Sequence, residues 1–179
     1  MSILDNILCT TDRLVIRQFE FSDWKDAMNY TSDELHLVYE AWGPYNQFET
    51  QEYISRILSA YHKVPQTYFS YAICLKDSGK LIGATSLRRK LNNLLTAELG
   101  YIIIPEYCRK GYAFEAMNKI LKEMSITHGI DKYYATCDVL NVPSQKLLLK
   151  LGFSIVDTLR NHIEMKGRMR DSYKYIKLV

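Results

Sequence analysis

The middle of the chain contains the stretch Pro105-Glu106-Tyr107-Cys108-Arg109-Lys110-Gly111-Tyr112-Ala113-Phe114-Glu115-Ala116, which separates two hydrophobic patterns. Before it, apolar residues follow one another as they do in a strand. After it, they recur at helical spacing as far as Met124. A strand, a short basic loop with a glycine and then a helix form an arrangement that binds phosphate. The first N–H groups of a helix lack partners within the helix, and the helix dipole favours an anion there.

The loop itself supplies suitable groups. Gly111 allows the backbone to approach a ligand closely, and Arg109 and Lys110 add positive charge. The stretch therefore indicates a ligand with a phosphate or pyrophosphate. An ordinary strand-to-helix turn with two solvated cations is the alternative, because neither Gly-x-x-x-x-Gly-Lys-[Ser/Thr] nor Gly-x-Gly-x-x-Gly occurs. Lys110–Phe114 also fits the start of an RNA-recognition motif, but helical spacing follows where that motif requires a base-stacking strand.

The loop belongs to a longer series of segments. Glu98-Leu99-Gly100-Tyr101 precedes it, and Asn141-x-x-Ser144-x-x-Leu147-Leu148-x-Lys150-Leu151-Gly152-Phe153 follows it after a second strand. The chain opens with Thr11-Asp12-Arg13-Leu14-Val15-Ile16-Arg17. In this order and spacing the segments resemble the GNAT superfamily of N-acetyltransferases. Within it they are most similar to the RimJ/RimL-like branch, which acetylates N-terminal alanine and serine of ribosomal proteins. The resemblance covers nearly the whole chain.

The hydrophobic patterns and the resemblance together predict one α/β domain over residues 1–179. Its sheet is expected to be mixed and mostly antiparallel, with splayed middle strands and flanking helices. Two early helices are expected, capped by Ser22 and Thr50, and a basic connection over Arg160–Asp171. The long central helix should end at Gly129. Strands are expected at Thr11–Phe19, Tyr68–Leu75, Leu81–Leu87, Leu94–Ile104, Lys132–Val139, Ser154–Leu159 and Ser172–Leu178.

Composition and charge limit the partners and cofactors that the chain is expected to have. The net charge of +3 is too small to argue for a nucleic-acid partner, and it is compatible with a polyanionic cofactor. Four scattered cysteines form no Cys-x-x-Cys pair, and no cluster has metal-ligand spacing, so we expect no metal and reduced thiols in a cytoplasmic protein. The sequence shows neither a signal peptide nor an apolar run long enough to span a membrane.

The resemblance implies acetyl-CoA as the acetyl donor. It implies that backbone groups of Tyr101, Ile102 and Ile103 pair with the pantetheine arm and that one N–H polarises the thioester carbonyl. It also implies that Asn141 bonds this arm and that Ser144 lies near the sulfur, although Asn141 could instead only cap its helix. The pyrophosphate is expected at the backbone of Arg109, Lys110, Gly111, Tyr112, Ala113 and Phe114.

Two positions depart from the family pattern. Cys108 stands where Gln or Arg is usual, and its two cationic neighbours suggest a lowered thiol pKa. Leu148 stands where many relatives place a tyrosine that protonates the leaving thiolate. The acid must then be Ser144, another tyrosine or solvent, and a thiolate leaves readily enough to need no dedicated acid.

Glu98 is the expected proton acceptor, because an attacking amine must be neutral and some base must take its proton. The alternative is a structural carboxylate paired with Arg88 or Arg89. The acceptor amine is expected at the segment between the early helices. Its polar and aromatic residues, each of which could instead be packing or surface, are Glu34, His36, Tyr39, Glu40, Trp42 and Tyr45. The basic connection Arg160–Asp171 should lie near the same side.

These expectations predict an N-acetyltransferase in which the amine attacks the thioester directly in a ternary complex. A protein N-terminus is the preferred acceptor, and a polyamine, antibiotic or metabolite amine is the alternative. An alternative of another class is a CoA-binding or CoA-sensing module without turnover. We expect no membrane and no specific nucleic-acid partner, and a homodimer is compatible with the sequence. The sequence identifies neither the acceptor nor the oligomeric state.

Overall fold

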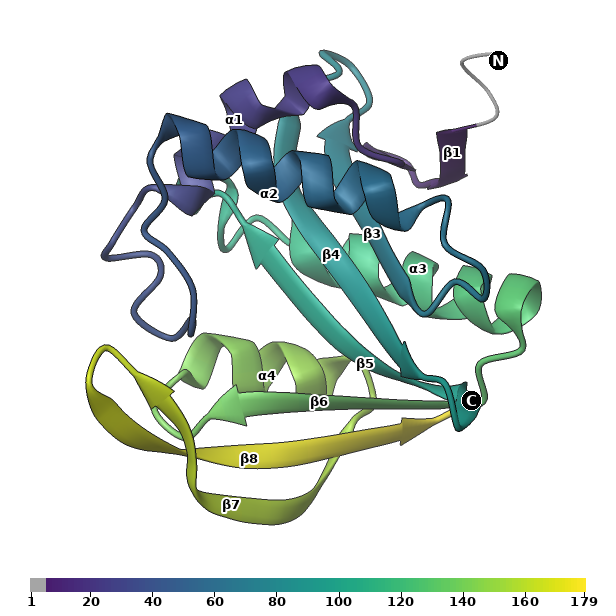
Figure 1. Cartoon of the computed structure of the whole chain (residues 1–179). Coiled ribbons are helices and arrows are strands. Elements are labelled where there is room, and N and C mark those ends of the chain that lie inside the picture. The colour runs from purple at the N-terminus through teal and green to yellow at the C-terminus, as the bar shows by residue number, and fades with distance from the viewer. Residues whose placement is uncertain (1–5) are drawn as a thin grey trace.

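A computed structural model describes residues 6–179 of the chain. Within these described residues, eight strands form one sheet in the order β1-β2-β3-β4-β5-β6-β8-β7, in which only the β5–β6 pair is parallel (Figure 1). The elements are β1 (Ile7–Thr10), β2 (Leu14–Arg17), α1 (Trp24–Thr31), α2 (Gln47–Ala60), β3 (Tyr68–Leu75), β4 (Leu81–Lys90), β5 (Asn93–Ile103), α3 (Tyr112–His128), β6 (Lys132–Asp138), α4 (Val142–Lys150), β7 (Ser154–Met165) and β8 (Arg168–Leu178).

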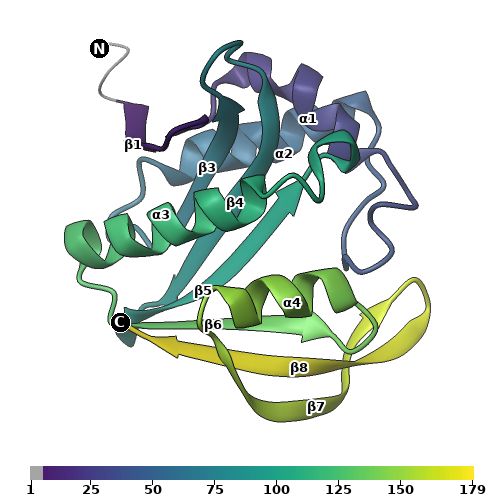
Figure 2. The same cartoon turned by 180° about the vertical axis from the view of Figure 1, so that it is seen from behind.

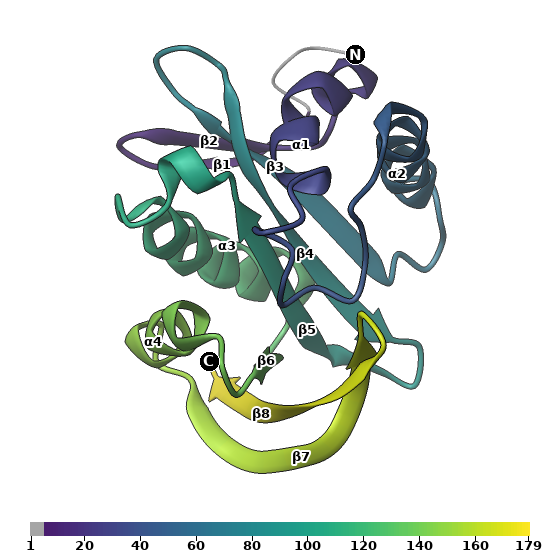
Figure 3. The same cartoon turned by 90° about the vertical axis from the view of Figure 1, so that its left-hand side faces the viewer.

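Helices cover both faces of the sheet. Figure 3 shows α1 and α2 on one side and α3 and α4 on the other. Successive side chains of β5 point to opposite faces of the sheet and so enter both cores. Leu99 and Ile103 pack toward α3, whereas Ile102, and Ile104 just after the strand, pack toward α1 and α2. The central helix ends, as predicted, at Gly129, whose φ of 64° lies in the left-handed region.

The sheet opens between β5 and β6. Their pairing covers only Thr96–Glu98 of β5 and Lys132–Tyr134 of β6. Beyond it, β6 continues to pair with β8 and β5 continues to pair with β4. Figures 1 and 2 show β5 and β6 diverging toward their carboxyl ends. This confirms the predicted mixed, mostly antiparallel sheet with splayed middle strands.

The start of each early helix differs from the prediction. A short 3-10 turn, Phe21–Asp23, precedes α1, and Glu20 and Asp23 form a capping box there, so Ser22 is not the cap. Asn46 accepts the N–H of Glu49 at 3.0 Å and begins α2 one turn before the predicted Thr50, which is buried within the helix. Asparagine and aspartate accept such bonds as readily as serine and threonine.

The predicted connection Arg160–Asp171 is wrong, because β7 and β8 extend through it as a hairpin. Ile163 pairs with Arg170 and Met165 with Arg168. The turn is Lys166-Gly167, and both residues have positive φ, 50° and 75°. The strands here are largely exposed on both faces, so their sequence lacks the apolar alternation that would have indicated them.

Candidate functional site

Two cavities meet where β5 separates from β6. The larger, of about 1210 Å³, lies between the open edge of β5 and the N-terminal ends of α3 and α4. The smaller, of about 660 Å³, lies between α2 and the strands β3, β4 and β5. Glu40, Tyr101 and Ile102 line both. A molecule in one cavity can therefore meet a molecule in the other beside the carboxyl end of β5.

The start of α3 presents unpaired backbone N–H groups to the larger cavity. Gly111 holds φ 84° at the N-cap position, where no side chain caps the helix. Counting from that cap, the first backbone N–H with a helical partner is that of Glu115, which bonds to the carbonyl of Gly111 at 3.1 Å. Gly111, Tyr112, Ala113 and Phe114 all line the cavity, and so do the cations of Arg109, Lys146 and Lys150. Free N–H groups together with these cations suit a pyrophosphate.

Lys110 differs from the other predicted loop residues that the structure describes, because it does not line this cavity. Its carbonyl accepts a hydrogen bond from Arg13 at 3.2 Å, and its ammonium lies 5.4 Å from the ring centre of Tyr107. It therefore supports the loop by its backbone and contributes charge only from outside.

The opening segment braces the loop. Glu115 accepts hydrogen bonds from the Thr11 hydroxyl at 2.6 Å and from Arg13 Nε at 2.7 Å, and the Arg13 guanidinium stacks 4.3 Å from the ring centre of Tyr112. Burial alone would raise the pKa of Glu115, but these hydrogen bonds outweigh it and hold the pKa below its ordinary value. Two segments about one hundred residues apart thus form one clasp, named here the Arg13–Glu115 clasp.

Cys108 does not have the lowered pKa that its neighbours suggested. Burial raises the pKa of its thiol, and Arg109 lowers it by less. The thiol points back to the backbone and lies 3.5 Å from the carbonyl oxygen of Ile103. A reactive thiolate at this position is therefore not favoured.

The open edge of β5 carries the predicted backbone groups. The N–H of Ile104 bonds to Ile82 on the β4 side, and the bonding groups of successive strand residues alternate in direction. Those of Tyr101 and Ile103 accordingly face the gap, whereas those of Ile102 face β4. Ile102 belongs to the site through its place in the walls of both cavities.

A pair of hydroxyl groups spans the gap from β5 to α4. The Tyr101 and Ser144 oxygens lie 2.7 Å apart, and burial raises the pKa of Tyr101 strongly. Asn141 caps α4 by accepting the N–H of Ser144 at 3.2 Å, and it also lines the larger cavity. Leu148, at the position where the family resemblance led us to expect a tyrosine, is only 1 % exposed and packs in the core.

Glu98 stands apart from the meeting point. It pairs with Arg88 across the β4–β5 ladder, four residues before Ile102, which is about 13 Å along a strand. Within residues 6–179 it lines neither cavity, and no ion pair joins it to Arg88 or Arg89. Its role as proton acceptor stays a prediction.

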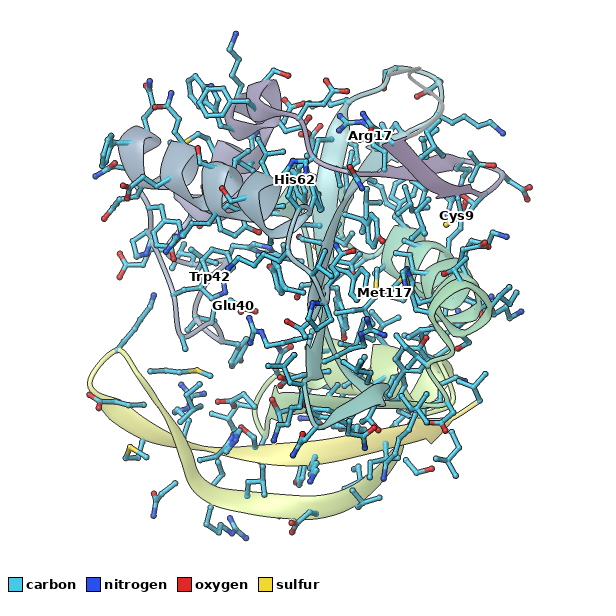
Figure 4. All side chains as sticks on the ribbon, turned by 45° about the vertical axis from the view of Figure 1, so that its right-hand side comes forward. Cys9, Arg17, Glu40, Trp42, His62 and Met117 are labelled. Atoms are coloured by element: carbon cyan, nitrogen blue, oxygen red, sulfur yellow. The ribbon has the colours of Figure 1, made fainter. Side chains whose placement is uncertain are left out.

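Glu40 is the carboxylate at the meeting point. Figure 4 shows it beside Trp42, in the segment between α1 and α2. Burial raises the pKa of Glu40 to about 7, and a hydrogen bond with Trp42 offsets part of this rise. Of the other predicted acceptor residues, His36 and Tyr39 line the larger cavity, and Trp42 and Tyr45 line the smaller. Glu34 lines neither, but its carbonyl accepts a hydrogen bond from Lys166 at the tip of the β7–β8 hairpin.

Several site residues escaped the sequence analysis. Lys146, Lys150 and Tyr107 line the larger cavity, and Arg56, Lys63 and Tyr53 line the smaller. Lys150 and Tyr107 lay within quoted motifs, but neither was assigned to the site. The others are single positions on helices or loops, and no motif marks which face of the element meets a cavity. Residues 6–179 contain no group of three side chains suited to a metal ion, and no helix there is long and apolar enough to cross a membrane.

Comparisons with known proteins agree with the fold. The Acetyltransferase (GNAT) domain model matches residues 13–154. An uncharacterized N-acetyltransferase, YnaD of Bacillus subtilis, is 28% identical over 93% of this chain and 94% of its own length. The uS5-alanine N-acetyltransferase of Escherichia coli is 25% identical over 95% and 90%, respectively. The crystal structure of a GNAT-family acetyltransferase from Bacillus anthracis has a TM-score of 0.84, with 26% identity over 97% of this chain and 98% of that one. The chain belongs to the GNAT family and is an N-acetyltransferase.

Proposed function

We propose that this enzyme transfers an acetyl group from acetyl-CoA to the N-terminal amine of a protein, by direct attack in a ternary complex. The observation that carries the proposal is that two cavities meet at one unpaired strand edge, where Glu40, Tyr101 and Ile102 line both. The larger cavity takes the donor and the smaller takes the acceptor. Holding both reactants at one point removes much of the entropic cost of their encounter.

The walls of the larger cavity fit the donor. Bound acetyl-CoA supplies a thioester whose thiolate leaves readily. The free N–H groups at the start of α3 and the cations of Arg109, Lys146 and Lys150 hold the pyrophosphate. The free backbone groups of Tyr101 and Ile103 pair with the pantetheine arm as an added strand would, and the amide of Asn141 lies on the opposite wall.

The chemistry then requires two proton transfers. The neutral amine nitrogen forms a bond to the carbonyl carbon, and a backbone N–H of the β5 edge stabilises the negative charge that develops on the carbonyl oxygen. A carboxylate takes the proton released by the nitrogen. The carbon–sulfur bond breaks, and the thiolate takes a proton from a hydroxyl group or from solvent. The products are CoA and the N-acetylated acceptor.

Two carboxylates compete for the role of proton acceptor. Glu98 would act through a chain of water molecules, because it stands about 13 Å along the strand from Ile102. Glu40 lies at the junction itself, and its pKa of about 7 suits proton transfer near neutral pH. Its position and its pKa favour Glu40 as the primary acceptor of the proton.

Ser144 and Tyr101 are the proposed source of the second proton. Their oxygens lie 2.7 Å apart at the wall of the donor cavity, so a proton given up by one hydroxyl can be replaced through the other. This arrangement would take the place of the tyrosine that Leu148 replaces.

The acceptor class follows from the relatives and from the shape of the site. One relative is named for acetylating an alanine of ribosomal protein uS5. A small amine is the second candidate, because the smaller cavity can enclose one on its own. A CoA-binding module without turnover is the third, since no tyrosine occupies position 148.

The test measures thiol release from acetyl-CoA with two pools of acceptors, peptides with free Ala or Ser N-termini and small polyamines or aminoglycosides. Release with the peptide pool alone supports the proposal. Release with the small amines alone overturns the protein acceptor and leaves the enzyme class intact. If neither pool gives thiol release and acetyl-CoA still raises the melting temperature, the result would support the non-catalytic module.

A further inference from the structure

The acceptor cavity is positively charged along its wall. Four cations line it, Arg56 on α2, Lys63 just after α2, and Arg88 and Arg89 on β4. Among the described residues, Glu40 is the one carboxylate that lines the same cavity. It lies at the junction with the donor cavity, and burial keeps it partly protonated near neutral pH. The positive charge is therefore not neutralised within the cavity.

Three of these cations are available to a ligand. Arg56, Lys63 and Arg88 are exposed, and in residues 6–179 no carboxylate lies within ion-pair distance of them. Arg89 differs, because its guanidinium donates to the carbonyl oxygens of Gln66 at 2.7 Å and Leu94 at 3.2 Å. These hydrogen bonds hold the loop next to β4 and leave Arg89 less free to bind a ligand.

The strand register sets the spacing between the reacting amine and these cations. Ala84 of β4 pairs with Ile102 at the junction, and Arg88 pairs with Glu98 four residues along. Four residues of extended chain span about 13 Å. An extended peptide whose terminal amine lies at Ile102 therefore places its fourth or fifth residue beside Arg88. Arg56 and Lys63 line the same cavity from the side of α2.

We propose that the acceptor is a protein N-terminus that carries acidic residues at about its fourth and fifth positions, and that Arg88, Arg56 and Lys63 bind them. This inference rests on the proposed function and adds the class of protein that the site selects. A polyamine places further ammonium groups where the wall is already positive, and like charges repel one another there. The aromatic side chains of Trp42, Tyr45, Tyr53 and Tyr68 complete the wall and can pack against the peptide backbone.

The experiment compares two peptides with the full-length enzyme at saturating acetyl-CoA. Both begin with Ala and differ only at positions four and five, which are Glu-Glu in one and Arg-Arg in the other, so that the N-terminal amine is the one primary amine. We expect kcat/KM to be at least about tenfold higher for the Glu-Glu peptide at low ionic strength. The preference should shrink as salt screens the exposed charges.

A charge reversal at the cavity locates the effect. Arg88→Glu should lower about tenfold the ratio of kcat/KM for the Glu-Glu peptide to kcat/KM for a neutral Gly-Gly peptide. Lys122→Glu makes the same net change on the exposed side of α3 and should preserve the preference. Equal rates for the charged peptides, or a preference for Arg-Arg, would overturn the inference while leaving peptide acetylation intact.

Failure of the proposed function gives a different result. If no peptide is acetylated and spermidine is, both the protein acceptor and its acidic character are wrong. If O-phosphoethanolamine is acetylated faster than the Glu-Glu peptide, the cations select a phosphate on a small amine, and the peptide assignment falls.

Discussion

The two cavities that meet at β5 are built in different ways. The donor cavity takes its binding groups mainly from the backbone, at the start of α3 and along the open edge of β5. The acceptor cavity takes its chemistry from side chains on α2, β3, β4, β5 and the segment before α2. Backbone groups bind any ligand of the right shape and charge, whereas side chains distinguish one ligand from another. On the proposed function, backbone groups would hold a cofactor that does not vary, and side chains would select the acceptor amine.

The largest expected effect comes from the carboxylate at the junction. Glu40→Gln should lower kcat about 100-fold or more, because a general base contributes roughly 10²–10⁴ to a rate. Binding of acetyl-CoA should stay within about twofold, because the donor is held by other groups. Steady-state kinetics and calorimetry check the two expectations separately.

The control is the other carboxylate. Glu98→Gln should lower kcat less than Glu40→Gln does. A larger loss in the Glu98 variant would make Glu98 the main proton acceptor and place the base outside both cavities. In the unchanged enzyme, kcat should rise with pH through about 7 as Glu40 loses its proton, and the Glu40→Gln variant should lack that rise.

The donor side should respond to the Arg13–Glu115 clasp. Arg13→Ala removes the ion pair with Glu115, whose closest atoms are 2.6 Å apart, and the stacking on Tyr112. Because 46% of the Arg13 side chain is exposed, the loss should be about 1 kcal/mol, which is roughly a fivefold weaker affinity for acetyl-CoA. Isothermal titration measures it.

Arg168→Ala is the matched control, since it removes an exposed arginine from the β7–β8 hairpin. Unchanged affinity in the Arg13 variant would show that the loop holds its shape without the clasp. The donor cavity would then depend on the backbone alone.

The hydroxyl pair should matter less than the base. Ser144→Ala and Tyr101→Phe should each lower kcat by about threefold, because the thiolate leaves readily and solvent can supply its proton. The double variant should lose little more than either single variant if the two hydroxyls act as one unit. Strict additivity of the two losses would contradict a shared proton path.

The sequence predicted the donor side much better than the acceptor side. The strand, loop and helix around Gly111 are contiguous, and the spacing of their hydrophobic residues changes within a few positions. One segment therefore sufficed to predict an anion site there. Asn141 and Ser144 lie together on the first turn of one helix. The caps at Glu20 and Asn46 were missed because several polar residues near each helix start could have served.

The acceptor side resisted prediction for a physical reason. Arg56, Arg88 and Glu40 come from separate segments, and each resembles an ordinary surface residue by its local pattern. Only the register of β4 against β5 and the position of α2 over the sheet bring them to one cavity. The Arg13–Glu115 clasp shows the same limit, because each residue lay in a quoted motif but their contact depends on the packing of α3 beside β1 and β2.

The smallest expected effect concerns stability, and it tests Glu40 independently of turnover. The folded-state pKa of Glu40 is raised from 4.5 to about 7, so between these values the folded protein binds more protons than the unfolded chain. Stability from this group is therefore complete below about pH 4.5 and is lost as pH rises through about 7. Glu40→Gln removes this partly buried charge and should raise the melting temperature at pH 8 by about 3 °C, which corresponds to roughly 1 kcal/mol for a chain of this size. At pH 5 the variant and the unchanged protein should melt within about 1 °C of each other.

Glu34→Gln, at an exposed position of the same segment, should shift neither value. A gain that is equal at both pH values would mean that Glu40 titrates normally, and the junction would then lose its distinguishing group while the donor cavity kept all of its own.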